Sequence, residues 1–173
     1  MTASVGAVMN RRSALVVGAT ALAGCLAEAD RGHQPREAEA EAHELINDAR
    51  TEAGVAPVDV TDALTSAARE HSRDMLAREY YSHTTPEGDD ASDRAGCSAG
   101  EILHRGEAGR MKNEGGDGVW YTYRPEELAG YVVEGWTLSS RHREILEAPR
   151  WQGVGVGVAI GDDDRFFATA VFC

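Results

Sequence analysis

Apolar residues recur at helical spacing in the first half of the chain. One such stripe runs through residues 37–53, and Gly54 is suited to end that helix. The same spacing predicts a second helix that runs to about Arg78 from Thr61 or Asp62, either of which can cap it. This half is therefore predicted to be mainly helical.

Turn-forming residues interrupt the middle of the chain. A short helix is predicted around residues 91–95, and the polar, glycine-rich residues 104–123 are predicted to cross the surface. Pro125 suits the first turn of another helix, and a further helical piece is expected near residues 142–146, before Pro149.

Alternating apolar residues mark the end of the chain. The segments "GVGVGVAI" and "RFFATAVFC" flank "GDDD", and their alternation predicts a hairpin of two strands. The glycine-rich segment lacks the turn into a helix that a phosphate-binding loop has, so it is predicted to be tightly packed sheet. Helices followed by strands indicate the α+β class.

The amino terminus has the features of an export signal. Arg11 and Arg12 precede an apolar run that is too short to cross a bilayer, and this order resembles a twin-arginine signal. The run ends in "LAGC", which resembles a lipobox with Cys25 as the lipidated residue; the alternative is a cleaved signal with an incidental cysteine. The predicted organisation is an export signal over residues 1–24, a lipidated cysteine and acidic tether over residues 25–39, and a domain over residues 40–173. We therefore expect an extracellular protein that a lipid anchors to the membrane at the cell surface.

Acidic residues dominate the charge of the chain. Asp and Glu number 29 against 17 Lys and Arg, which gives a net charge of -12 and argues against nucleic acid as a partner. Lys112 is the only lysine. An acidic, lysine-poor surface favours a halophilic protein that stays soluble in high salt, although it also suits an ordinary acidic protein.

Two cysteines remain if Cys25 carries lipid. Outside the cell an even pair favours a disulfide, here between Cys97 and Cys173, which would contribute about 2–4 kcal/mol. The alternative is two buried thiols.

Four stretches of sequence point to a family. They are "YSHTTPEG", "GEIL", "WTLSSRHREIL" and "WQGVGVGVA", in that order. Together they resemble the CAP superfamily, the SCP-like domain of cysteine-rich secretory proteins, antigen 5 and pathogenesis-related 1 proteins, in its prokaryotic secreted form. The resemblance covers about residues 40–173. It implies an α-β-α sandwich with helices on both sides of a small, mainly antiparallel sheet.

The resemblance also implies a surface cleft. Its residues would be His83, Glu101 and His142, with Ser139 at the position where eukaryotic members carry a second glutamate. His83 and His142 could bind a divalent cation such as Zn²⁺, with Glu101 completing or orienting the set. The alternative is a polar network that only stabilises the cleft.

An asparagine is missing from two of these stretches. The family patterns G-E-N-I and H-R-x-N-I-L read "GEIL" and "HREIL" here. If these are single deletions within helices, each turns the residues that follow by about 100°.

Three other groups of residues indicate a functional site less strongly. His71 lies on the apolar face of the second helix and is predicted to be a hydrogen-bonded core residue. His104 is predicted to be an exposed loop residue. Ser139, Ser140 and His142 suggest a serine hydrolase, but the chain has no G-x-S-x-G elbow.

The sequence thus supports three functions. The first is a binding module whose cleft takes a small molecule, a lipid or a cell-envelope component. The second is a metal-assisted hydrolase with Glu101 as general base and with His83 and His142 holding the metal and its water. The third is a structural surface protein.

Overall fold

The computed structural model describes residues 35–108, 111–112, 119–120 and 124–173. The predicted export signal, Cys25 and most of the tether lie outside the described residues. The helices are α1 (Pro35–Glu52), α2 (Asp62–Arg78), α3 (Ala91–Ala95), α4 (Pro125–Leu138) and α5 (Ser140–Leu146). The strands are β1 (Asp59–Val60), β2 (Gly100–Glu107), β3 (Met111–Lys112), β4 (Val119–Trp120), β5 (Gly153–Ile160) and β6 (Arg165–Phe172). No helix in the described part of the chain is long and apolar enough to span a membrane.

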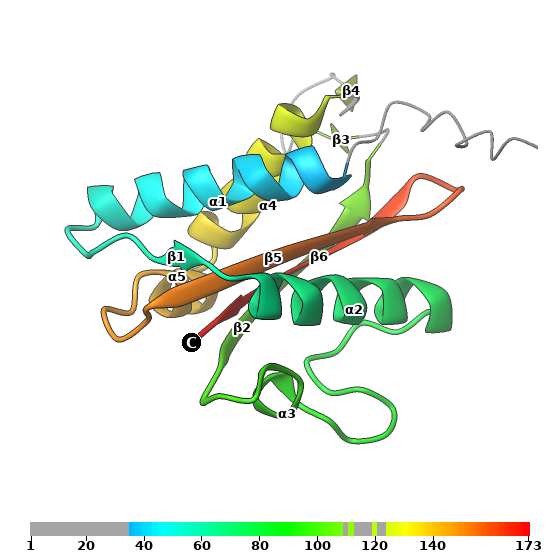
Figure 1. Ribbon diagram of the computed structural model, residues 1–173. Helices are drawn as coiled ribbons and strands as arrows, with labels where there is room; N and C mark the ends of the chain where they lie inside the picture. Colours follow the sequence, from blue (N-terminus) through cyan, green and yellow to red (C-terminus); the bar gives the residue numbers. More distant parts are fainter. Residues whose placement is uncertain (1–34, 109–110, 113–118, 121–123) are drawn as a thin grey trace, which may run out of the picture.

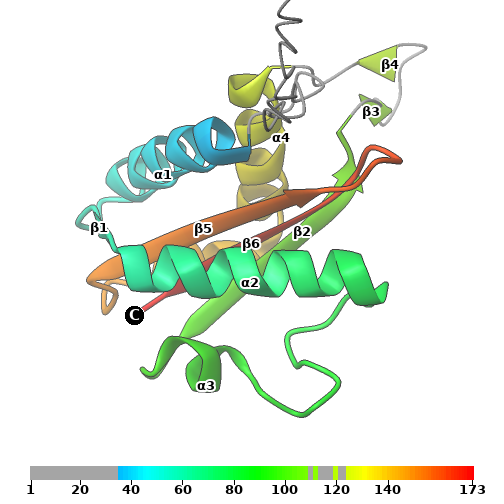
Figure 2. The same cartoon turned by 45° about the vertical axis from the view of Figure 1, so that its right-hand side comes forward.

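One sheet of four strands separates two layers of helices. Its order is β1-β5-β6-β2, in which only β1 and β5 run parallel. Helices α1, α4 and α5 lie on one side of the sheet, and α2 and the short α3 lie on the other (Figures 1 and 2). The predicted α+β class and the α-β-α sandwich with a mainly antiparallel sheet are confirmed.

The alternating glycines of β5 let helix α2 pack directly on the sheet. A Cβ at Gly155 would lie 2.1 Å from backbone atoms of Leu64 and Thr65, and one at Gly157 would lie 2.1 Å from the backbone of Arg69. The valines of β5 point to the other face, into the core beneath α1 and α4. The prediction of tightly packed sheet is confirmed, and it fixes the position of α2 above β5.

One prediction about the middle of the chain was wrong, and one conditional expectation does not apply. Residues 104–107 belong to strand β2, which pairs with the whole of β6, and so the predicted surface excursion does not begin at residue 104. Most of the remaining residues of that prediction lie outside the described residues. Glu101 also lies on this strand and not in a helix. A deletion beside Glu101 would therefore exchange the two faces of a strand, whereas a helix would turn by about 100°.

A disulfide joins Cys97 to Cys173, with 6.2 Å between their Cα atoms, and so confirms the predicted pair. It ties the loop after α3 to the end of β6. Helix α3 and the start of β2 are thereby held beside the end of β6, next to the residues of the predicted cleft.

Candidate functional site

The three histidine and glutamate residues of the predicted cleft meet in one hollow at the edge of the sheet. His83 comes from the loop after α2, Glu101 from the edge strand β2, and His142 from α5. The hollow, called the cleft below, has a volume of about 490 Å³. Its ionisable lining residues are His83, Asp90, Glu101, Arg141, His142 and Arg150. Ser139 joins α4 to α5 and is not among the residues that line the cleft.

Glu101 is the buried anchor of the cleft. The residue is 6% exposed, and each carboxylate oxygen has its own partner. Oε1 lies 2.8 Å from Nδ1 of His83, and Oε2 accepts a hydrogen bond from Nη2 of Arg94 at 2.5 Å. Because a buried carboxylate is costly unless it is paired, these two contacts explain how Glu101 is tolerated there.

Arg94 is the site residue that the sequence reasoning missed. Besides Glu101, its guanidinium donates to the backbone oxygens of His83, at 3.2 Å, and Asp89, at 2.9 Å. Arg94 therefore fixes both the glutamate and the loop that carries the histidine. Its only local signal is the short helix α3, which begins in a capping box of Asp90 and Asp93, and that pattern does not indicate which way an arginine points.

His71 lies behind Glu101 in the protein interior. It is 1% exposed, and its Nε2 is 3.0 Å from the backbone oxygen of Ser82 and 3.9 Å from Oε1 of Glu101. Burial is the main cause that lowers the pKa of His71, so the ring is neutral near pH 7. The prediction of a hydrogen-bonded core histidine is confirmed, and this histidine fixes the start of the His83 loop.

The two cleft histidines differ in their surroundings. The side chain of His83 is 56% exposed although its Nδ1 is held by Glu101. His142 is half-buried, and its Nδ1 is enclosed without a hydrogen-bond partner in the described structure. Burial, followed by the charges of His83 and Arg141, lowers the pKa of His142. The two rings are close enough to influence each other, and His83 is the more exposed of the two.

His104 is not the exposed loop residue that was predicted. It lies on β2, half-buried between the rings of Tyr131 and Phe166, whose centroids are 5.1 and 5.9 Å away. Burial and the nearby charge of His142 lower the pKa of His104 to about 4. This histidine belongs to the packing beneath α4.

The described residues do not complete a metal centre. They include no group of three or more His, Cys, Asp and Glu side chains placed to hold a metal ion. Glu101 already has both oxygens engaged, so His83 and His142 would be left as a pair, whereas catalytic zinc sites use three protein ligands. A divalent cation on these two histidines stays a prediction.

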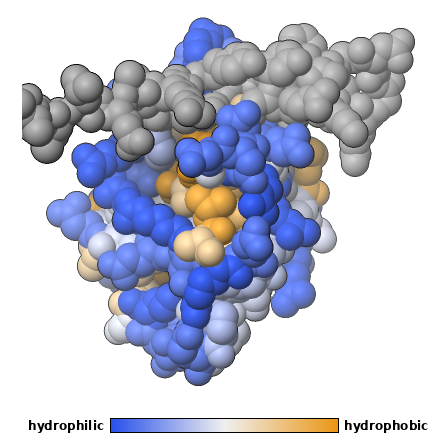
Figure 3. Space-filling view, turned by 90° about the vertical axis from the view of Figure 1, so that its right-hand side faces the viewer, coloured by the Kyte–Doolittle hydropathy of each residue, from blue (hydrophilic) through white to orange (hydrophobic). Residues whose placement is uncertain are grey.

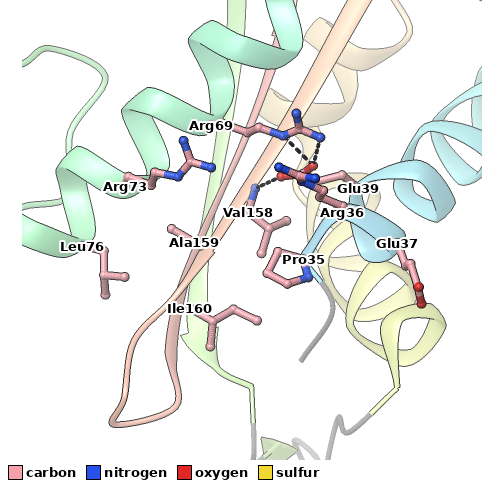
Figure 4. Close-up of a pocket in the computed structure, with 10 residues that line it drawn as sticks. All are labelled: Pro35, Arg36, Glu37, Glu39, Arg69, Arg73, Leu76, Val158, Ala159 and Ile160. Atoms are coloured by element: carbon pink, nitrogen blue, oxygen red, sulfur yellow. Dashed lines mark hydrogen bonds and ion pairs between the residues drawn. The ribbon is translucent and has the colours of Figure 1, made fainter. Parts of the chain in front are cut away.

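A second hollow lies between the start of α1 and the end of α2. Its volume is about 600 Å³, and we call it the α1–α2 groove. Leu76, Val158, Ala159 and Ile160 supply apolar lining, and Arg36 and Arg73 lie at its side (Figure 4). Figure 3, which views this side of the molecule, shows apolar side chains in a hollow among hydrophilic ones.

Comparison with known proteins identifies the family. The model of the CAP family, the cysteine-rich secretory protein family, matches residues 43–173, and the chain belongs to this family. A curated relative, the uncharacterized protein YkwD of Bacillus subtilis (strain 168), is 29% identical over 120 residues, which are 66% of this chain. The chain spans 39% of the length of that relative.

Solved structures share the fold. An outer surface protein from Borrelia burgdorferi has a TM-score of 0.63 at 17% identity, over 79% of this chain and 92% of that one. An extracellular protein with an SCP domain from Bacillus anthracis str. Ames has a TM-score of 0.59 at 22% identity, over 80% of this chain and 40% of that one.

Proposed function

We propose that this CAP-family protein is a non-enzymatic binding module, whose cleft takes a small molecule, a lipid or a component of the cell envelope. The observation that carries the proposal is the exposed ring of His83, held by the buried Glu101 inside an open hollow. A side chain that is fixed before a ligand arrives loses little freedom on binding, which favours affinity.

The same proposal places the protein outside the cell. The disulfide between Cys97 and Cys173 suits an oxidising compartment, and the similar structures include an outer surface protein and an extracellular protein. We propose that the twin-arginine-like segment exports the chain and that a lipid on Cys25 anchors the domain over residues 40–173 to the membrane. The acidic composition supports a halophilic surface.

The geometry favours binding over metal-assisted hydrolysis. A general base must reach the proton that it removes, directly or through one water. In the cleft both oxygens of Glu101 are already engaged, one by Arg94 and one by His83, and the residue is 6% exposed. Glu101 is therefore better placed to orient His83 than to activate a water molecule.

The proposal can be tested by ligand retention. The exported protein would be incubated in high salt with an extract of the cell envelope, freed of unbound material, and examined by native mass spectrometry. We expect a retained molecule that is lost in His83→Ala and in Glu101→Gln but kept in Arg143→Gln, a control on the same helix as His142 whose side chain lines a different hollow. Melting temperatures would show that the variants are folded. Equal retention in all four proteins, or none in any, would contradict the proposal.

A further inference from the structure

Two arginines at the cleft have no partner of opposite charge among the residues that the structure describes. Arg141 of α5 and Arg150 of the loop before β5 both line the cleft and are exposed. Within the described residues neither guanidinium group forms a hydrogen bond or an ion pair, and that of Arg150 lies over the ring of Trp151, 4.0 Å from its centroid. Stacking of this kind holds a guanidinium in place and leaves its N–H groups free to donate.

The two carboxylates of the cleft, by contrast, already accept hydrogen bonds. Glu101 is bound by Arg94 and His83. Asp90 caps α3, where its Oδ1 accepts hydrogen bonds from the backbone N–H groups of Ser92, at 2.8 Å, and Asp93, at 3.1 Å.

The cleft is therefore less acidic than the chain as a whole. Its lining carries two guanidinium groups, Arg141 and Arg150, and two carboxylates, Asp90 and Glu101, in a protein with a net charge of -12. Arg94 behind the lining pairs with Glu101, so the charge of that carboxylate is balanced before a ligand arrives. A divalent cation would meet unpaired guanidinium groups and carboxylates that are already engaged. An anion would meet free guanidinium donors, and both carboxylates of the lining already accept hydrogen bonds.

We propose that the ligand of the cleft carries a phosphate group, which Arg141 and Arg150 bind at its mouth. This inference rests on the proposed function, because it names the chemistry of the molecule that the same site takes. The planar fork of arginine matches two phosphate oxygens at once, which makes phosphate a better fit than a single-point acceptor. The phosphate can belong to a lipid headgroup or to a soluble molecule, and the two sources are separable by experiment.

The first measurement is titration of the exported protein with inorganic phosphate, at the lowest salt concentration that keeps it folded, because salt screens such contacts. We expect saturable binding that weakens at least tenfold in the double variant Arg141→Gln/Arg150→Gln. The matched control is Arg143→Gln, which removes a charge of the same kind from the same helix at a side chain that lines another hollow. The control should bind as the wild type does.

The second measurement separates the sources. Vesicles of phosphatidylcholine, with and without phosphatidic acid, would be sedimented with the wild type and the double variant. Binding of phosphatidic acid vesicles but not of inorganic phosphate, lost in the double variant, supports a lipid headgroup. Binding of inorganic phosphate without the vesicles supports a soluble ligand.

Other outcomes overturn the inference. One is that neither probe binds, and another is that the double variant binds as well as the control. A titration with Zn²⁺ then tells the two proposals apart. Saturable Zn²⁺ binding that is lost in His83→Ala would leave the cleft as a binding site while rejecting phosphate. A cleft that binds neither phosphate nor Zn²⁺ and retains no envelope molecule would reject both proposals.

Discussion

Two buried glutamates of this protein have different sets of partners for their carboxylate groups. Glu39 on α1 is 2% exposed; its Oε2 accepts a hydrogen bond from Nε of Arg69 at 2.7 Å, and its Oε1 accepts one from the backbone N–H of Val158 at 2.9 Å (Figure 4). Glu101 on β2 is 6% exposed and also binds an arginine, but its other oxygen faces the ring of His83. The two sites thus differ in one partner, a backbone amide in one and a solvent-exposed ring in the other.

That one partner separates a structural carboxylate from the one that we propose to be functional. Strand β1 pairs with β5 only at Gly153 and Val154, so the outer edge of β5 is open beyond them. Glu39 supplies the acceptor that a neighbouring strand would offer to Val158, and it thereby joins α1 to the sheet. Glu101 instead orients a side chain that can meet a ligand. A buried carboxylate with a charged partner is therefore not enough to mark a site.

The largest expected effect is the loss of Glu39. Glu39→Ala would leave the N–H of Val158 unpaired and the guanidinium of Arg69 without its partner, at a cost of about 3–5 kcal/mol in the free energy of unfolding. Urea denaturation would measure it. Glu44→Ala, an exposed position on the same helix, is the control and should change stability by less than about 0.5 kcal/mol. A comparable small loss in both variants would show that Glu39 does not join α1 to β5.

The free energy of unfolding should also depend on pH, through a histidine next to Glu39. His43, one turn along α1, is 6% exposed, and burial together with the charge of Arg69 lowers its pKa from 6.5 to about 4. The unfolded chain therefore binds a proton on His43 more readily than the folded chain does. The contribution of the neutral ring to stability is complete above pH 6.5 and is lost as the pH falls toward 4. The shift corresponds to a loss of about 3 kcal/mol at most.

The measurement is the urea midpoint between pH 7 and pH 4 for the wild type and for His43→Leu. We expect a shallower dependence in the variant, with a remainder from His104, whose pKa burial also lowers to about 4. Parallel curves for the two proteins would mean that His43 does not carry this dependence.

The arginines that bind the two buried glutamates, Arg69 and Arg94, provide a more direct test of the comparison. The side chain of Arg94 is 13% exposed and that of Arg69 is 30% exposed, so screening by water weakens the second pair more. We expect Arg94→Gln to cost about 2 kcal/mol and Arg69→Gln about 1 kcal/mol. Thermal or urea unfolding of both variants would measure the difference.

The same pair should differ in function. Arg94→Gln should also weaken ligand retention, because the backbone oxygen of His83 loses its donor, whereas Arg69→Gln should not. If both variants bound ligand equally well, Arg94 would be a structural residue like Arg69.

How much of this could be predicted depends on what each element shows locally. The glycines of β5 alternate with valines, and this strict pattern predicted both the strand and its close packing, because glycine is needed only on the face that α2 covers. His83, Glu101 and His142 were found from motifs and their order. They lie on three different elements that meet only in the fold, so no local pattern could have joined them.

The failures have a physical cause as well. Strand β2 is an edge strand, and its sequence "GEILHRGE" mixes buried and exposed positions that do not alternate cleanly. His104 therefore looked like a loop residue although its ring packs against Phe166. Arg94 could not be found because its role depends on where α3 sits relative to β2, and contacts between elements set that position.

The smallest expected effect on stability is also the sharpest test of function. His83→Ala removes a side chain that is 56% exposed, so its hydrogen bond to Glu101 should contribute less than about 1 kcal/mol to stability. Arg94 would still bind the carboxylate, so the cleft keeps its shape. We expect ligand retention to fall sharply while the urea midpoint barely moves. If stability fell by as much as in Glu39→Ala and retention did not change, Glu101 and His83 would be a structural pair, and the distinction between the two buried glutamates would fail.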